Sequence, residues 1–138
     1  MRILAIDPGE RQIGIAISDP TGTIAKPLTT LQHVSRLVDA ASIADRANEH
    51  EVELIIIGKS LNEDGLPTQQ SRRSDRLAHA IQQQCPIPVR FWDESFSTQE
   101  ARQARIEMGV SRRKRSGHLD ELAATVILQS YLDSRQKE

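Results

Sequence analysis

The chain has 138 residues, enough for one domain with a single hydrophobic core. Hydrophobic residues make up 38% and charged residues 27% of the sequence, which excludes collagen-like and wholly disordered chains. The formal net charge of −1 excludes a uniformly basic chain, and the scarcity of aromatic residues argues against a surface on which single-stranded bases stack.

Cysteine usage and hydropathy indicate the compartment. The single cysteine, Cys85, excludes an internal disulfide and a multi-cysteine zinc site. The longest dense apolar stretches, Leu54–Ile57 and Leu122–Leu128, are far too short to span a bilayer. Met1-Arg2 leads straight into a strand-like segment with no signal-peptide pattern. We therefore expect a cytoplasmic protein.

The first part of the chain is predicted to form a β-meander. Short β-prone segments over Arg2–Ile6, Gln12–Ser18 and Thr23–Leu31 are separated by the turn signals Asp7-Pro8-Gly9 and Asp19-Pro20-Thr21-Gly22. A parallel return needs a crossover of about a dozen residues or more, so strands this close in sequence must form antiparallel hairpins. The chain therefore opens with three antiparallel strands.

From Ser35 onward, helices alternate with strands. The apolar run before Gly58 predicts a strand buried on both faces. The helices on either side of it are each predicted to have one apolar face, with Leu37, Ala40, Ala41, Ala44 and Ala47 on the first and Leu77, Ala78 and Ile81 on the second. The order predicts an α/β fold in one domain over residues 1–138, in which a mixed five-stranded sheet has helices on both faces. The predicted elements after the meander are a helix over Ser35–Glu49, a strand over Leu54–Ile57, a helix over Thr68–Gln84, a strand over Val89–Trp92, a helix from Ser97 to Gly109 and a helix from His118 to about Ser134.

Three acidic residues stand out by their placement. Asp7 ends the first strand, Glu94 follows the fifth strand directly, and Asp120 is predicted in the first turn of the last helix. Functional sites of open α/β sheets gather at the carboxyl ends of parallel strands, where Asp7 and Glu94 both lie. These three acids are the candidate catalytic residues.

The position of Asp120 follows from the helical repeat of about 100° per residue. The predicted buried face consists of Leu119, Leu122, Ala123, Val126 and Ile127. Asp120 falls at the edge of this face, where a carboxylate needs a metal ion or a basic partner because burying an unpaired charge is costly. His118, two residues earlier, is a candidate proton shuttle, although a polar helix-entry role is the simpler interpretation.

Carboxylates from three separate elements that meet at one sheet edge form an oxygen-rich, negatively charged pocket. Such a pocket suits Mg²⁺ or Mn²⁺. Two such ions about 4 Å apart can activate water and neutralise the leaving oxygen of a phosphodiester. Each acid also has an ordinary alternative role: Asp7 as a turn residue, Glu94 in a solvated strand end and Asp120 as an acid that complements the helix dipole.

Basic residues concentrate between Arg102 and Arg115, where six of them stand against one acid. The densest part, Ser111–Gly117, is predicted as a loop immediately before the helix that bears Asp120. A cationic loop beside an anionic metal pocket suits a polyanionic substrate, whose flanking phosphates the loop would hold. The alternative is a solvated run of charges. The basic residues of this loop are Arg112, Arg113, Lys114 and Arg115.

Four motifs stand in order along nearly the whole chain. They are Asp7-Pro8-Gly9, the Asn62-x-Asp64-Gly65 loop, Trp92-Asp93-Glu94 with Ser97-Thr98, and Asp120-Glu121-Leu122-Ala123-Ala124 with Ile127-Leu128-Gln129. Together they resemble the YqgF/RuvX family of bacterial RNase H-like proteins, to which pre-16S rRNA nuclease and Holliday junction resolvase functions are ascribed. The resemblance implies an RNase H-like fold and a metal-dependent endonuclease that acts on the 5′ end of precursor 16S ribosomal RNA. It also implies that Asp7, Glu94 and Asp120 are the catalytic acids and the metal ligands.

Three positions differ from the family's pattern, and all concern how phosphates are held. The family's basic pair after the first turn is here Arg11-Gln12, its usual Gly-Leu-Pro after the fourth strand is Gly58-Lys59-Ser60, and Ser95 stands where an Arg often follows the Asp-Glu pair. None of these changes removes a catalytic acid. We predict that Arg11 and Lys59 contact nucleic acid together with the basic loop, with Lys59 adding a charge near the pocket.

Branched DNA is the closest alternative substrate, because phosphate contacts and metal chemistry are alike for RNA and DNA. A junction resolvase cuts two strands symmetrically and must act as a homodimer, whereas a monomer would favour RNA. A non-catalytic RNA-binding factor with the same fold is a further alternative, against which the three intact acids argue. An actin-like ATPase needs two such domains, and the chain has no P-loop motif.

Overall fold

The computed structural model describes residues 1–60, 66–93 and 115–136, with side chains from residue 122 onward in the last helix. These residues form a five-stranded sheet with the strand order β3-β2-β1-β4-β5. The third predicted helix, from Ser97 to Gly109, lies outside the described residues. The elements are β1 (Ile3–Pro8), β2 (Gln12–Ser18), β3 (Ala25–Gln32), α1 (Arg36–Glu49), β4 (Leu54–Lys59), α2 (Gln69–Gln84), β5 (Val89–Asp93) and α4 (Arg115–Gln136).

The predicted meander and mixed sheet are both confirmed. β1 pairs with β2 and β2 with β3 in antiparallel ladders, whereas β4 pairs with β1 and β5 with β4 in parallel ladders. Pro27 lies in β3, which is an edge strand, and the ladder shifts register opposite it. A proline is tolerated there because an edge strand has one side without ladder partners.

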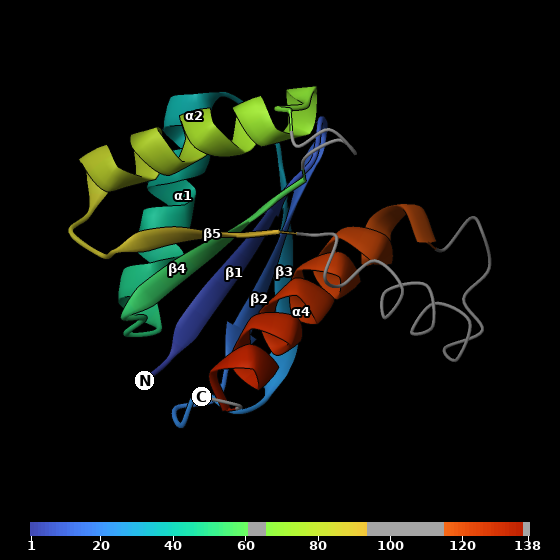
Figure 1. Ribbon diagram of the computed structural model, residues 1–138. Helices are drawn as coiled ribbons and strands as arrows, with labels where there is room; N and C mark the ends of the chain where they lie inside the picture. Colours follow the sequence, from blue (N-terminus) through green and yellow to red (C-terminus); the bar gives the residue numbers. More distant parts are fainter. Residues whose placement is uncertain (61–65, 94–114, 137–138) are drawn as a thin grey trace.

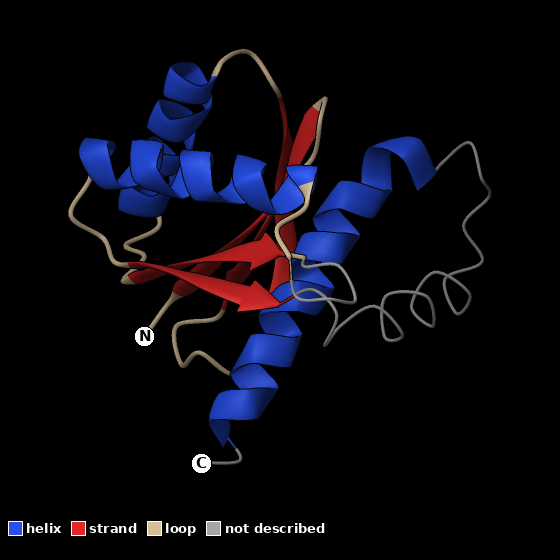
Figure 2. Ribbon diagram, turned by 45° about the horizontal axis from the view of Figure 1, so that its top comes forward, coloured by secondary structure: helices blue, strands red, loops and turns tan. Residues whose placement is uncertain are grey.

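The sheet separates two hydrophobic layers, because α1 and α2 cover one face and α4 covers the other (Figure 1, Figure 2). Alternate residues of β1 point to opposite faces. Leu4 and Ile6 belong to the layer under α1 and α2, and Ile3 and Ala5 belong to the layer under α4. The prediction of helices on both faces is therefore confirmed. Within the described residues, no helix is both long and apolar enough to cross a membrane.

The first two helices begin at side-chain caps. The Ser35 hydroxyl accepts a hydrogen bond from the Val38 N–H at 3.2 Å, and Thr68 and Ser71 form a reciprocal capping box. The buried side of α1 holds Ala40, Ala44 and Ala47, as predicted, and also Ile43. Leu37 was also predicted on this apolar side, and this prediction is wrong, because Leu37 lies in the first turn of α1, at the edge of the buried stripe, and is 69% exposed.

Two strands run further than their sequence signals predict. β1 continues through Asp7 to Pro8, and β4 continues through Gly58 to Lys59. Gly58 was predicted to close β4, but the parallel ladder pairs it with Trp92 of β5 and so extends the strand. β1 and β4 therefore extend further at their carboxyl ends, which is the end of the sheet where the candidate acids were predicted.

The last helix differs most from its prediction. It begins at Arg115, so residues 115–117 of the predicted loop are helical and Asp120 is the sixth residue of α4 rather than part of its first turn. One glycine in a helix costs about 1 kcal/mol relative to alanine, which a 22-residue helix packed on a sheet tolerates. The buried face is also rotated from the predicted one, and consists of Ala124, Ile127, Leu128, Tyr131 and Leu132.

Candidate active site

Asp7 lies near the carboxyl end of β1, in the centre of the sheet, and is half-buried. Its side chain lies on the face covered by α4, because it follows Ile3 and Ala5 in the alternation of the strand. The turn that follows is tight: the Gly9 N–H donates to the Gln12 carbonyl at 2.9 Å. A Cβ at Gly9 would lie 2.5 Å from that same carbonyl oxygen, so this turn requires glycine.

Glycines flank Asp7 on both neighbouring strands. Asp7 pairs with Gly14 of β2. On the other side, Ile6 pairs with Ile57 of β4, which brings the next residue, Gly58, level with Asp7. Directly paired residues have their Cβ positions on the same face of a sheet. The Asp7 carboxylate therefore stands in a row whose two adjacent positions carry no side chain, which leaves room beside it for other groups.

Trp92 of β5 packs against the C-terminal half of α4. Its indole N–H donates to the Ser130 hydroxyl at 3.1 Å, and its ring meets Tyr131 edge-on at a centroid distance of 5.4 Å. Gly58 pairs with Trp92, so the row of paired positions on the α4 face runs from Gly14 through Asp7 and Gly58 to Trp92.

α4 runs antiparallel to β1. Gln129 accepts a hydrogen bond from the Ala25 N–H at 2.9 Å. Ala25 pairs with Ser18, whose hydroxyl accepts from the Ile3 N–H at 2.8 Å. Gln129 is thereby level with the start of β1, and the N-terminal half of α4 extends toward the end of β1 that carries Asp7 (Figure 1).

Of the three predicted catalytic acids, only the Asp7 side chain lies within the described residues. Glu94 directly follows Asp93, the last residue of β5, and lies outside them. Asp120 lies in α4, four residues before the buried Ala124, and its side chain is likewise outside the described part. Within the described ranges, no three histidine, cysteine or acidic side chains form a metal-binding group. The catalytic and metal-binding roles of the trio stay predictions.

Of the predicted basic contacts, only the side chains of Arg11 and Lys59 lie within the described residues. Arg11 is exposed in the turn after Asp7. Lys59 is the last residue of β4, and its side chain turns to the α2 side, where its ammonium group pairs with Asp75 at 2.9 Å and lies 4.7 Å from the centre of the Phe91 ring. Lys59 is therefore not drawn toward the Asp7 face. Arg112, Arg113 and Lys114, and the side chain of Arg115, lie outside the described residues.

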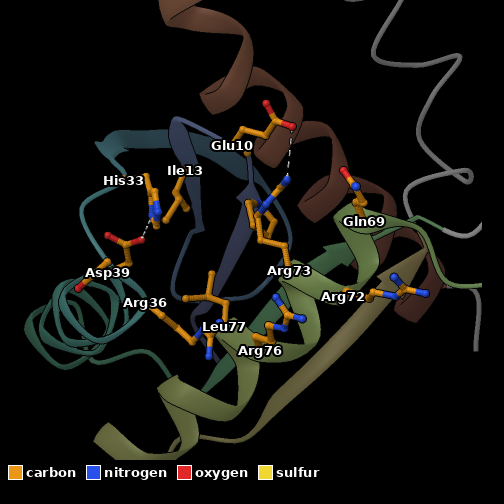
Figure 3. A pocket seen from close by; sticks show the side chains of 13 residues that line it. Glu10, Ile13, His33, Arg36, Asp39, Gln69, Arg72, Arg73, Arg76 and Leu77 are labelled. Atoms are coloured by element: carbon orange, nitrogen blue, oxygen red, sulfur yellow. Dashed lines mark hydrogen bonds and ion pairs between the residues drawn. The ribbon is translucent and has the colours of Figure 1, made fainter.

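An arginine-lined cavity of about 510 Å³ opens beside the same turn, on the face covered by α1 and α2 (Figure 3). Pro8 and Gly9 form part of its wall, and Ile13 and Leu77 are its apolar lining. This cavity was not predicted from the sequence. The available signal was the clustering of three arginines within five residues of the second helix. The basic residues of the cavity are Arg36 of α1 and Arg72, Arg73 and Arg76 of α2, together with His33.

The two acids that line this cavity are both engaged. Glu10 pairs with Arg73 at 3.8 Å and is 77% exposed, which makes a weak ion pair. The Asp39 side chain is 4% exposed and bonds the His33 ring. Asp39 also accepts the Val34 N–H at 3.1 Å, which anchors the start of α1 to the segment after β3.

Sequence comparison gives matches over nearly the whole chain. Residues 1–134 match the sequence profile of the family described as "RuvX: Holliday junction resolvase". A protein of Thermoanaerobacter pseudethanolicus is 41% identical, with 100% of both chains covered. A protein of Syntrophus aciditrophicus is 42% identical and covers 100% of this chain and 92% of its own length. Both carry the name "Putative pre-16S rRNA nuclease".

Solved structures show the same fold at low sequence identity. RuvC of T. thermophilus in complex with a Holliday junction substrate aligns with a TM-score of 0.61 and 15% identity, over 99% of this chain and 96% of the other. The fowlpox virus resolvase in complex with Holliday junction DNA aligns with a TM-score of 0.60 and 15% identity, over 98% and 99% of the two chains. These likenesses confirm the predicted RNase H-like fold.

Proposed function

The chain belongs to the RuvX family of Holliday junction resolvases, and we propose that it is a metal-dependent endonuclease that processes the 5′ end of precursor 16S ribosomal RNA. The names of the relatives at about 40% identity support this substrate. The observation that carries the chemistry is the position of Asp7, a half-buried carboxylate between two glycines at the carboxyl end of β1 in the mixed sheet.

The other two acids are proposed to meet Asp7 on the α4 face. Trp92 lies on this face, so the alternation of β5 predicts the same side for position 94. The 3.6-residue repeat of α4 predicts that position 120, one turn before the buried Ala124, faces the sheet.

The lengths of the two elements agree with this meeting. Gln129 is level with Ile3 through the hydrogen bonds and strand pairing described above. Nine residues of helix from Gln129 back to position 120 span about 13.5 Å, and four residues of strand from Ile3 to Asp7 span about 13 Å. These matching lengths support a position for residue 120 at the level of Asp7.

The proposed donor set fits a hard divalent cation, because all three ligands are carboxylates. Asp7, Glu94 and Asp120 would hold the ion, and Gly14 and Gly58 leave space beside Asp7 for phosphate oxygens or water. Bound there, Mg²⁺ or Mn²⁺ supplies an activated water and neutralises the leaving oxygen. A chain that presents these acids acts as a hydrolase on phosphodiester bonds.

Branched DNA is the second candidate substrate. The description of the family favours it, and so do the two resolvase structures that share the fold and hold Holliday junctions. The discriminating experiment offers precursor 16S RNA and four-way DNA junctions side by side, with and without Mg²⁺ or Mn²⁺, together with the mass of the protein in solution. Cleavage of the RNA by a monomer supports the RNA proposal. Symmetric cleavage of the junction alone by a homodimer contradicts it.

Replacement of the central carboxylate tests the metal site. We expect Asp7→Asn to abolish metal-dependent cleavage and to leave the fold intact, because it removes a metal ligand while keeping the volume of the side chain. Cleavage of labelled substrate in Mg²⁺ and in Mn²⁺ is the measurement, with circular dichroism and a thermal melt to report the fold. Asp45→Asn is the matched control, since Asp45 is exposed on α1. If Asp7→Asn cuts as fast as the parent, the metal-site proposal is wrong.

A further inference from the structure

We propose that the arginine cavity between α1, α2 and the β1–β2 turn binds phosphate groups of the RNA strand next to the phosphate that is cleaved at Asp7. This proposal rests on the nuclease function proposed above and adds a second contact region on the opposite face of the sheet. The strand would pass from the α4 face, over the Pro8–Gly9 turn, into the cavity.

The charge of the cavity is the first argument. Four arginines line it, and the described residues contain no ion pair between a carboxylate and Arg36, Arg72 or Arg76. Of the two acids that line the cavity, the buried Asp39 pairs with the His33 ring, and the exposed Glu10 pairs with Arg73. The excess of cations is repulsive in the free protein and is relieved by an anion.

The chemistry of the lining is the second argument. A guanidinium presents a planar fork of N–H donors that matches phosphate oxygens in a bidentate manner. Arginines from α1 and α2 line the cavity together with the apolar side chains of Ile13 and Leu77, so it offers cations for charged oxygens and apolar surface for the less polar part of a nucleotide (Figure 3). The volume of about 510 Å³ is within the usual range of ligand pockets.

The cavity lies next to the turn that follows Asp7, and this position favours an RNA strand over a small anion as its ligand. Gly9 lines the cavity and is two residues from Asp7, so their Cα atoms are at most about 7 Å apart. A phosphate that reaches Asp7 therefore has its neighbours along the strand within reach of the cavity. A site for free phosphate or a mononucleotide would need fewer than four arginines and no border with the catalytic edge.

A double variant tests the proposal by RNA affinity. Arg36→Ala with Arg76→Ala removes one guanidinium from each helix, and both residues are exposed. The matched control is Lys26→Ala with Arg135→Ala, which also removes two exposed cations and lies at the opposite end of the sheet, near Met1 and Gly22. Affinity for a precursor RNA fragment is measured from 50 to 300 mM salt in the Asp7→Asn background, where the RNA stays intact.

The expected result separates the two double variants. The Arg36/Arg76 variant should bind roughly tenfold more weakly at low salt, and the slope of log affinity against log salt should fall by about 1.4, because each single-strand phosphate contact contributes about 0.7. The control should keep the parent's affinity and slope. Equal losses in both variants, or no loss in either, overturn the proposal.

Chemical protection identifies the bound species. Phenylglyoxal modifies accessible guanidinium groups, and peptide mass spectrometry reports its rate at Arg36 and Arg76. We expect the RNA fragment to slow this modification at concentrations at which inorganic phosphate and adenosine monophosphate have no effect. Protection by the small anions at the same concentrations overturns the proposal in favour of a site for a small anion.

The failure of this inference is distinguishable from failure of the nuclease proposal. If the Arg36/Arg76 variant binds RNA like its control while Asp7→Asn abolishes cleavage, the cavity has no role in substrate binding and the active site stands. If Asp7→Asn cuts like the parent but RNA still protects Arg36 and Arg76, the active-site proposal is wrong and the cavity stands as an RNA contact.

Discussion

The Asp19 carboxylate organises the turn between β2 and β3. One of its oxygens accepts the N–H groups of Thr23 at 2.8 Å and Ile24 at 2.9 Å, and the other accepts from the hydroxyl and N–H of Thr21. The hydrogen bond from the Ile24 amide, followed by those from Thr21 and Thr23, holds the pKa of Asp19 well below its ordinary value. The ionised form therefore stabilises the folded state.

The sign of this pKa shift sets a pH dependence. An acid with a lowered pKa contributes stability that is present above its unfolded pKa, about 3.9 for aspartate, and is lost as the pH falls toward the folded value. We expect Asp19→Asn to melt at a lower temperature than the parent at pH 7, because one charged acceptor is lost. The gap between the two melting temperatures should narrow from pH 6 to pH 3 in thermal denaturation. A gap that stays constant over this range contradicts the assignment.

Asp7 shows what a residue's sequence context can predict and what it cannot. A short apolar strand before Pro-Gly was sufficient to predict an acid at the edge of the sheet. The glycines beside it, Gly14 and Gly58, are significant only through the register of β1 with β2 and β4. Register across β4 depends on contacts between residues that are about fifty positions apart, and no local pattern specifies it.

The helices test how far hydrophobic periodicity identifies buried faces. Leu128 of α4 is fully buried between the helix and the sheet, whereas Leu37 of α1 is largely exposed. We expect Leu128→Ala to lower the free energy of unfolding by about 2–5 kcal/mol, because it leaves a cavity. Leu37→Ala should change it by less than about 0.5 kcal/mol, as exposed substitutions usually do. Urea unfolding of both variants is the measurement, and equal losses would contradict the assigned faces.

The sequences of α2 and α4 differ in how clearly they define one apolar face. In α2, polar residues surround Leu77, Ala78 and Ile81, so one stripe was possible and it is confirmed. In α4, apolar residues occur around most of the helix from 119 to 132, and several stripes fit the sequence equally well. Packing on β1, β2 and β3 selects the stripe of Ala124 and Leu128, which local periodicity could not reveal.

The arginine cavity could not be predicted, because it is a product of tertiary packing. Arg36 and Arg76 are 40 positions apart and come together only because α1 and α2 pack side by side on the same face. A scan for dense basic runs instead selects the segment from Arg102 to Arg115. Basic residues that are far apart in the sequence can therefore lie close together in the folded chain, where a scan for basic runs does not find them.

The complete chain is nearly neutral, with a net charge of −1, so its affinity for a polyanion depends on where the charges lie. We expect combined replacement of Arg112, Arg113, Lys114 and Arg115 by alanine to weaken RNA binding. It should also reduce the salt slope by up to about 2.8, at about 0.7 per phosphate contact. Affinity titrations at several salt concentrations provide the measurement. A slope equal to that of the parent would show that this segment is a solvated surface.

The position of α4 has a consequence for the newborn chain. All five strands leave the ribosome before this helix, yet α4 alone among the described elements covers the sheet face that carries Ile3, Ala5, Ala16, Leu54 and Ile56. Until α4 docks, that hydrophobic face is exposed to other nascent polypeptides and to chaperones. The same helix carries Asp120. A chain whose α4 has not docked would therefore be prone to aggregation and, under the proposed chemistry, inactive as a nuclease. Docking of α4 would remove both defects at once.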